Sequence, residues 1–397
     1  MNSNRIKLID SLRGFSLLGI LMANLLIFQY GIWGKDEINI DTLSKLDVFS
    51  LQFIKIAFES TFLPIFSLLF GYSLIKLVES IKERRNKSRW HLIRRGIGLL
   101  VIGIIHSTYI WEGDILTFYG LMLFVLLPFI HRKAKTLLIW SSILVVLLGV
   151  LSYGENVSDK TEQAEMQQFI EETNNVYANG TYMDILDYRK NAMPPGFEDP
   201  IFIFFLLLLS PIFMLPMFLL GMAMAKRQYF INPAQEKRSY LLGWLFFPVG
   251  LVLKLLAYKA GLVAYSAIFT QVGGQLLAIG YILIFSFLYS KFSNKFIFTA
   301  LESMGKLSLS NYLMQSIICT LIFYGYGLGF YNHLGVFYSI ILGGIIFCIQ
   351  CGCSILYVRF FRRGLIEHFL RVWTNLSLSG NIRKSAHNHM DNSNLKL

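Results

Sequence analysis

Charged residues are scarce in this 397-residue chain, at 15% of the total, whereas hydrophobic residues make up 55%. A soluble globular domain carries about 25% charged residues, so the composition argues against a soluble protein. The mean hydropathy of +0.54 supports the same conclusion. We therefore expect a protein whose helices cross a membrane several times.

Cysteine is also rare, and the four copies all fall near the end of the chain: Cys319, Cys348, Cys351 and Cys353. Because the predicted outer loops contain none, we expect no structural disulfide. The spacing in CIQCGC resembles that of a metal site, but a metal-bound thiolate in a lipid-facing helix needs polar partners. We predict small buried hydrophobic residues here and no metal site.

Long apolar runs are abundant, and a membrane-spanning helix needs about 20 such residues. Ten runs are candidate spans: 12–33, 60–78, 96–111, 115–130, 136–153, 201–224, 240–258, 266–290, 309–330 and 336–358. The first run is too long for the apolar part of a signal peptide, so we expect it to be retained. The predicted fold is an all-α, polytopic membrane helix bundle of about ten transmembrane helices, with both termini cytoplasmic.

The net charge of +12 reflects topology rather than a nucleic-acid site. With the N-terminus inside, Lys and Arg concentrate in the inner segments and acidic residues in the outer ones, as the positive-inside rule requires. The basic stretches 82–95, 131–135 and 359–363 are expected to contact anionic lipids, with a CoA-like anion as the alternative. We predict a multi-pass protein of the cell membrane, with membrane lipids and no nucleic acid as partners.

The chain divides into four parts by composition. These are an N-terminal five-helix half (1–153), an acidic extracytoplasmic segment (154–200), a C-terminal five-helix half (201–374) and a cytoplasmic tail (375–397). The acidic segment either forms short helices over the outer mouth of the bundle or only links the two halves. The polar tail is predicted to be disordered.

Polar side chains inside the predicted spans are costly, so each is a functional candidate. In the first span, Arg13 and Asn24 are eleven residues apart. That spacing places them on one helix face, about 16 Å from each other. Arg95 and His106 repeat the spacing in the third span. Asn24 either takes part in function or simply bonds another helix.

The third and fourth predicted spans have only about 16 apolar residues each, fewer than a crossing requires. Their turn, WEGD, is therefore expected to lie below the outer surface in a cavity lined by water or protein. His106 and Asp114 in such a cavity have the groups that general acid–base catalysis needs. For Glu112 we favour a structural role at the helix end.

Three further polar residues complete the candidate set. Glu59 opens the second span, near its outer end. Asn311 and Gln315 are spaced i, i+4 on one helix face and can form hydrogen bonds across helices. We assign these three, with Arg13 and Arg95, to substrate binding.

Several stretches resemble the YeiB-type membrane proteins, whose C-terminal half is the domain of unknown function 418. The stretches are DSLRGFSLLGILMAN, IFSLLFGYS, IIHSTYIWEGDILTFYG and GKLSLSNYLMQSIICTLIFYGYGLGF. The resemblance covers essentially the whole chain. More distantly, the chain is similar to heparan-alpha-glucosaminide N-acetyltransferase and the acyltransferase-3 proteins, which move an acyl group from cytosolic acyl-CoA to a sugar or glycan across the membrane.

This resemblance implies an acyltransferase-like protein with acyl-CoA, expected to be acetyl-CoA, as donor and an extracytoplasmic glycan, envelope polymer or lipid head group as acceptor. It matches Arg13 and Asn24 to the first-helix residues of those enzymes. Acyltransferase-3 proteins have histidine at the position of Asn24, so the catalytic base must come from elsewhere. His106, oriented by Asp114, is the expected base, His333 is the reserve, and Asn24 would stabilise the oxyanion.

Two functions of other classes stay open. A transporter or exporter of a small solute would use the same polar groups but would release its substrate unchanged, whereas a transferase consumes acyl-CoA. A non-catalytic membrane partner or sensor would need these groups only for stability. A homodimer also stays open.

Overall fold

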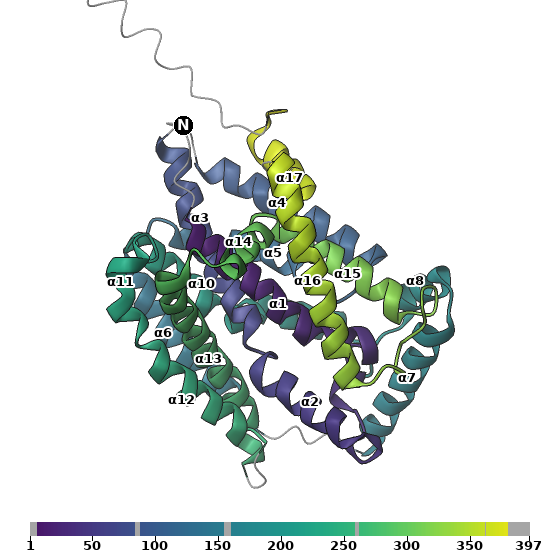
Figure 1. Ribbon diagram of the computed structural model, residues 1–397. Helices are drawn as coiled ribbons and strands as arrows, with labels where there is room; N and C mark the ends of the chain where they lie inside the picture. Colours follow the sequence, from purple (N-terminus) through teal and green to yellow (C-terminus); the bar gives the residue numbers. More distant parts are fainter. Residues whose placement is uncertain (1–5, 84–87, 155–159, 259–261, 362, 380–397) are drawn as a thin grey trace, which may run out of the picture.

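The computed structural model describes residues 6–83, 88–154, 160–258, 262–361 and 363–379 (Figure 1). Within these ranges the chain forms α-helices and short 3-10 helices, and no strand. The predicted all-α fold is confirmed. The predicted disordered tail lies, from residue 380 on, outside the described residues.

Seventeen α-helices follow one another in the described chain. They are α1 Lys7–Tyr30, α2 Lys45–Ala57, α3 Phe62–Glu83, α4 Ser88–Tyr109, α5 Leu116–Leu126, α6 Ala134–Leu151, α7 Lys160–Asn179, α8 Tyr182–Asn191, α9 Pro200–Leu209, α10 Pro211–Lys226, α11 Pro233–Tyr240, α12 Gly243–Leu256, α13 Val263–Phe292, α14 Phe296–Lys306, α15 Ser308–Phe323, α16 Val336–Phe360 and α17 Leu365–Asn375. The 3-10 helices are Gly34–Asp36, Ile40–Thr42 and Leu127–Phe129.

Six of the described segments are long and apolar enough to cross a membrane: Lys7–Tyr30, Lys45–Glu83, Ser88–Tyr109, Ala134–Leu151, Val263–Phe292 and Val336–Phe360. The pair α11–α12, bent by 46°, would be a seventh. Three other predicted spans hold shorter apolar helices of 10–17 residues: Leu116–Phe129, Pro211–Lys226 and Ser308–Phe323. Length and composition thus support six or seven crossings in the described chain, against the ten predicted.

The prediction that the third span is short was wrong, because α4 has 22 residues and includes Arg94 and Arg95. Helix α17 binds this basic part of α4. The Trp373 indole donates to the Arg94 carbonyl at 2.7 Å, and the Arg94 Nε donates to the Thr374 carbonyl at 2.9 Å. The fourth span is short as predicted, since α5 has 11 residues.

Helix α1 occupies the middle of the bundle, between α3, α13, α14, α15 and α16 (Figure 1). Two glycines allow α14 to lie directly against it. A Cβ at Gly14 would overlap the carbonyl oxygen of Leu301, and a Cβ at Gly305 would overlap that of Asp10. The polar side chains of α1 are therefore held by close backbone contact.

The bundle has two chemically different ends. We call the end with turn 110–115 the hairpin end, and the end with Arg94 and α17 the basic end. The acidic segment lies at the hairpin end, where residues 160–191 form α7 and α8, and α8 packs on α4 (Figure 1). Of the two expectations for this segment, short helices rather than a plain linker are found.

Helices α3 and α10 cross at two glycines, Gly71 and Gly221. A Cβ at Gly221 would overlap the carbonyl oxygen of Leu68.

We predict that Gly221→Ala lowers the free energy of unfolding by about 1–3 kcal/mol, because backbone atoms cannot rotate away. Gly344→Ala is the control, since nothing lies within 4 Å of its added Cβ. Thermal unfolding in detergent tests the pair, and equal melting temperatures would contradict the crossing.

Candidate functional site

The turn between α4 and α5 is built by two sets of local hydrogen bonds. The amides of Ile110 and Trp111 both donate to the carbonyl of His106, each at 2.9 Å, which ends α4. The Asp114 Oδ2 accepts from the Thr117 amide at 2.7 Å and from its hydroxyl at 2.8 Å, which begins α5. The last turn of α4 and the first turn of α5 therefore meet.

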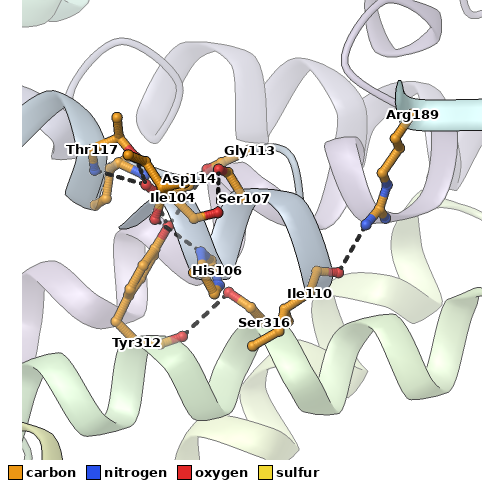
Figure 2. Close-up of polar contacts among 11 residues, drawn as sticks. Ile104, His106, Ser107, Ile110, Gly113, Asp114, Thr117, Arg189, Tyr312 and Ser316 are labelled. Carbon is orange, nitrogen blue, oxygen red and sulfur yellow. Dashed lines mark hydrogen bonds and ion pairs between the residues drawn. The ribbon is translucent and has the colours of Figure 1, made fainter. Parts of the chain in front are cut away.

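This turn brings His106 and Asp114 together, as Figure 2 shows. The His106 Nδ1 lies 2.8 Å from the Asp114 Oδ1, and each side chain is only 1% exposed. Because a carboxylate only accepts hydrogen bonds, the His106 Nδ1 donates to the Asp114 Oδ1. Thr117 fixes Asp114, and Asp114 in turn fixes the imidazole.

Two buried ring nitrogens beside this pair have no hydrogen-bond partner among the described residues: His106 Nε2 and Trp111 Nε1. The two rings lie 6.4 Å apart between centroids. Buried polar atoms almost always have a partner, so neighbouring exceptions need an explanation. They mark the place where a reacting group could be bound.

Residues from two distant helices enclose the pair. Phe28 of α1 stacks on Trp111 with centroids 4.1 Å apart. The Tyr312 ring of α15 lies 5.5 Å from the His106 ring, and its hydroxyl accepts from the Ile115 amide at 3.2 Å. Phe28 and Tyr312 were not predicted from the sequence, because a periodic apolar pattern does not distinguish them from other core aromatics.

Asn24 lies on the side of α1 that carries Phe28, which it precedes by one turn. It is therefore about 6 Å nearer the basic end than Phe28. Asn24 is half-buried and forms no hydrogen bond with a described residue. Its amide is available for a ligand.

Arg13 and Arg95 lie at the opposite, basic end. Arg13 pairs with Asp10 at 3.2 Å and also donates to the Ser73 hydroxyl. Arg95 is near enough to Arg13 for the two charges to act on each other. Each arginine thus stands eleven residues before the polar group on its own helix.

Glu59 takes part in a different cluster, at the break between α2 and α3. Its carboxylate lies 2.5 Å from Lys35 Nζ, and its carbonyl accepts from Lys254. Burial lowers the pKa of Lys35, but the carboxylates of Glu59 and Asp36 outweigh burial and raise it overall. Lys254 is 1% exposed and does not extend to the surface. These contacts hold the break in place.

Asn311 and Gln315 connect α15 to α16, as the i, i+4 spacing predicted. The Asn311 amide donates to the Ser354 hydroxyl at 3.0 Å, and the Gln315 amide donates to the Gln350 side chain at 3.0 Å. None of the hydrogen bonds that these two side chains form in the described chain reaches His106. Their proposed part in substrate binding stays a prediction.

Polar side chains of α7 and α8 cover the hairpin turn. We call the group formed by Glu112, Tyr177 and Arg189 the clasp. Glu112 forms an ion pair with Arg189 of α8 at 2.6 Å and accepts from the Tyr177 hydroxyl of α7. Burial, together with Glu112, raises the pKa of Tyr177 well above its ordinary value, so the phenol stays protonated and donates. Arg189 also donates to the Ile110 carbonyl at 3.2 Å (Figure 2). Glu112 therefore has the structural contacts favoured from sequence, but its partners were missed.

Fold and site together define a helical membrane protein with a buried His–Asp pair between a short hairpin and a central helix. Residues 224–377 match the family described as "Protein of unknown function (DUF418)". The chain belongs to this YeiB-type family, as its motifs predicted.

Two relatives match almost end to end. "Uncharacterized protein YxaH" of Bacillus subtilis is 32% identical over 95% of this chain and 96% of its own length. "Uncharacterized protein YeiB" of Escherichia coli is 24% identical over 93% of this chain and 95% of its own length. No solved structure matches the chain.

We predict that Arg189→Gln loosens α7 and α8. It removes a charge-assisted hydrogen bond, which contributes about 1.5–3 kcal/mol, so amide hydrogen exchange in 160–191 should rise roughly 10- to 100-fold. Lys190→Gln is the control, because Lys190 is exposed and forms no ion pair in the described chain. Equal exchange in both variants would show that the clasp does not hold the two helices.

Proposed function

We propose that this protein is a membrane-embedded acyltransferase of the cell membrane, with its basic end cytoplasmic. It would move an acyl group, expected to be acetyl, from acyl-CoA to an extracytoplasmic glycan, envelope polymer or lipid head group. The observation that supports this most directly is the His106–Asp114 pair, with 2.8 Å between Nδ1 and Oδ1 and an unpartnered Nε2.

This arrangement suits general base catalysis. The carboxylate fixes the tautomer and orientation of the ring and stabilises the imidazolium that forms when Nε2 accepts a proton. A buried location also makes the electrostatic interaction between the two groups stronger than it would be in water. His333 is exposed and therefore lacks this advantage.

The proposed reaction transfers the acyl group from the CoA sulfur to the acceptor and returns His106 to its starting state. Nε2 of His106 takes the proton of an acceptor hydroxyl or amine, whose oxygen or nitrogen attacks the thioester carbonyl carbon. The oxyanion that forms accepts a hydrogen bond from the Asn24 amide. The carbon–sulfur bond then breaks, the CoA thiolate takes the proton from His106, and the neutral imidazole is restored.

The two ends of the bundle fit the two substrates. Arg13 and Arg95 at the basic end would attract the anionic donor, and α1 and α4 extend from these arginines to Asn24 and His106. The acceptor would enter from the hairpin end, which α7 and α8 cover. The acceptor would enter when the ion pair between Arg189 and Glu112 breaks.

We predict that His106→Ala lowers transfer from labelled acetyl-CoA by about 10²- to 10⁴-fold, the usual contribution of a general base. Asn24→Ala should lower it by about 10²- to 10³-fold. The assay measures CoA release and labelled product with the purified protein. His333→Ala is the matched control and should keep full activity.

Each rival function predicts a different result. A transporter carries solute that emerges unmodified and consumes no acyl-CoA. A non-catalytic protein shows a lower melting temperature in His106→Ala and no turnover in any variant. Wild-type protein that neither binds nor consumes acyl-CoA would end the enzyme proposal.

Thr117→Val tests whether Asp114 acts through its position. The change keeps the side-chain shape and the backbone donor but removes the hydroxyl that bonds Oδ2 at 2.8 Å. We expect transfer to fall about tenfold, in line with the loss of one hydrogen bond to a charged group. The Michaelis constant for acyl-CoA should stay constant, because Thr117 lies at the hairpin end. A change in that constant alone would contradict a positioning role.

A further inference from the structure

Arg95 is a cation in a membrane helix that has no hydrogen bond or ion pair with any described residue. It is only partly exposed. Charged side chains inside membrane proteins are normally paired, because an unpaired charge is costly there. Arg95 therefore requires a partner from outside the described chain.

The charges near Arg95 add to its need for an anionic partner. Arg13 of α1 and Arg371 of α17 act on Arg95 by repulsion, and Glu367 of α17 by attraction. The guanidinium groups of α1 and α17 thus act on that of α4 at the basic end. Two carboxylates, Asp10 and Glu367, also belong to the charged groups of this end.

Both carboxylates are already engaged. Asp10 accepts from Arg13 at 3.2 Å. Glu367 accepts from the amides of Leu309 and Ser310 at 2.8 and 3.0 Å, and from the Ser310 hydroxyl at 2.5 Å. These bonds satisfy the exposed N–H groups at the start of α15, so Glu367 is not free to move to Arg95.

Helix α17 has the features of a helix at the membrane surface. Leu365, Phe369 and Trp373 recur every four residues along one face and are 75%, 60% and 41% exposed. The rest of the helix packs on α4 and α15, with Leu370 buried and the Trp373 indole bonded to the Arg94 carbonyl. An apolar face of this kind is typical of a helix at the lipid boundary, so we infer that Arg371 lies at the depth of the lipid head groups.

We propose that Arg95, Arg13 and Arg371 form a binding site for a phosphate group that reaches the basic end at head-group depth. Guanidinium groups bind phosphate through paired N–H donors, and several of them around one dianion remove their mutual repulsion. An anionic lipid and a soluble organic phosphate carry the same group. That the ligand is the acyl-CoA donor rests on the function proposed above, whereas phosphate binding does not.

The test uses the purified full-length protein with two probes. Pyrophosphate binding is measured by calorimetry in uncharged detergent, and phosphatidylglycerol binding is measured in nanodiscs against phosphatidylcholine. Arg95→Gln should weaken binding of the effective probe roughly tenfold or more, as expected for a lost contact between charged groups. Arg89→Gln removes one charge from an exposed position of the same helix and should change affinity less than about twofold.

Stability without ligand gives a second measurement. A partnered arginine lowers the melting temperature when it is removed, whereas Arg95→Gln should keep or raise it, because a repelled charge disappears. A lower melting temperature would mean an internal partner and would overturn the site. Equal loss of binding in Arg95→Gln and Arg89→Gln would mean general attraction by charge and would also overturn it.

The two probes distinguish the source of the phosphate. Binding of pyrophosphate alone supports a soluble ligand, binding of phosphatidylglycerol alone supports a lipid, and binding of neither overturns the proposal. His106→Ala should bind the effective probe normally. A protein that binds phosphate but transfers no acyl group would therefore overturn the proposed function and leave this site in place.

Discussion

The buried carboxylate of Asp114 is the group on which the hairpin end depends. A charge with 1% exposure is tolerated only if hydrogen bonds replace the lost water, and here His106 and Thr117 supply them. The same bonds end one helix, begin the next and orient the imidazole. One set of contacts therefore supports both the fold of the turn and the proposed chemistry. Further side chains keep water from that carboxylate, and these are Phe28, Tyr312 and the clasp at Glu112.

The molecule separates its charges along its length. Guanidinium groups collect at the basic end, and the His–Asp pair lies at the hairpin end, with α1 and α4 extending between them. Arg13 and Asn24 on α1 match Arg95 and His106 on α4 in spacing. In the transferase that we propose, a donor and an acceptor arriving from opposite sides could thus meet without either crossing the membrane.

Much of the fold could be predicted from the sequence, because a chain in lipid must satisfy its backbone within each segment and so forms helices wherever apolar runs are long. The all-α class, the short α5 and the cross-helix bonds of Asn311 and Gln315 followed from such local patterns. The length of α4 did not, because its polar first turns lie outside the apolar run, and their bonds to α17 come from a distant part of the chain. The ten predicted crossings are not confirmed, since described helices such as α15 are shorter than the apolar runs that contain them.

The sequence by itself determined which residues carry charge at membrane depth, and it paired His106 with Asp114 because only one tight turn separates them. Tertiary structure decided everything that depends on distant segments: Phe28 against Trp111, Arg189 on Glu112, and α17 against α4. Local periodicity fixes which face of a helix is polar, but it does not fix which helix that face meets. Helix packing selects that neighbour, because glycines such as Gly14 and Gly305 set how closely two backbones approach.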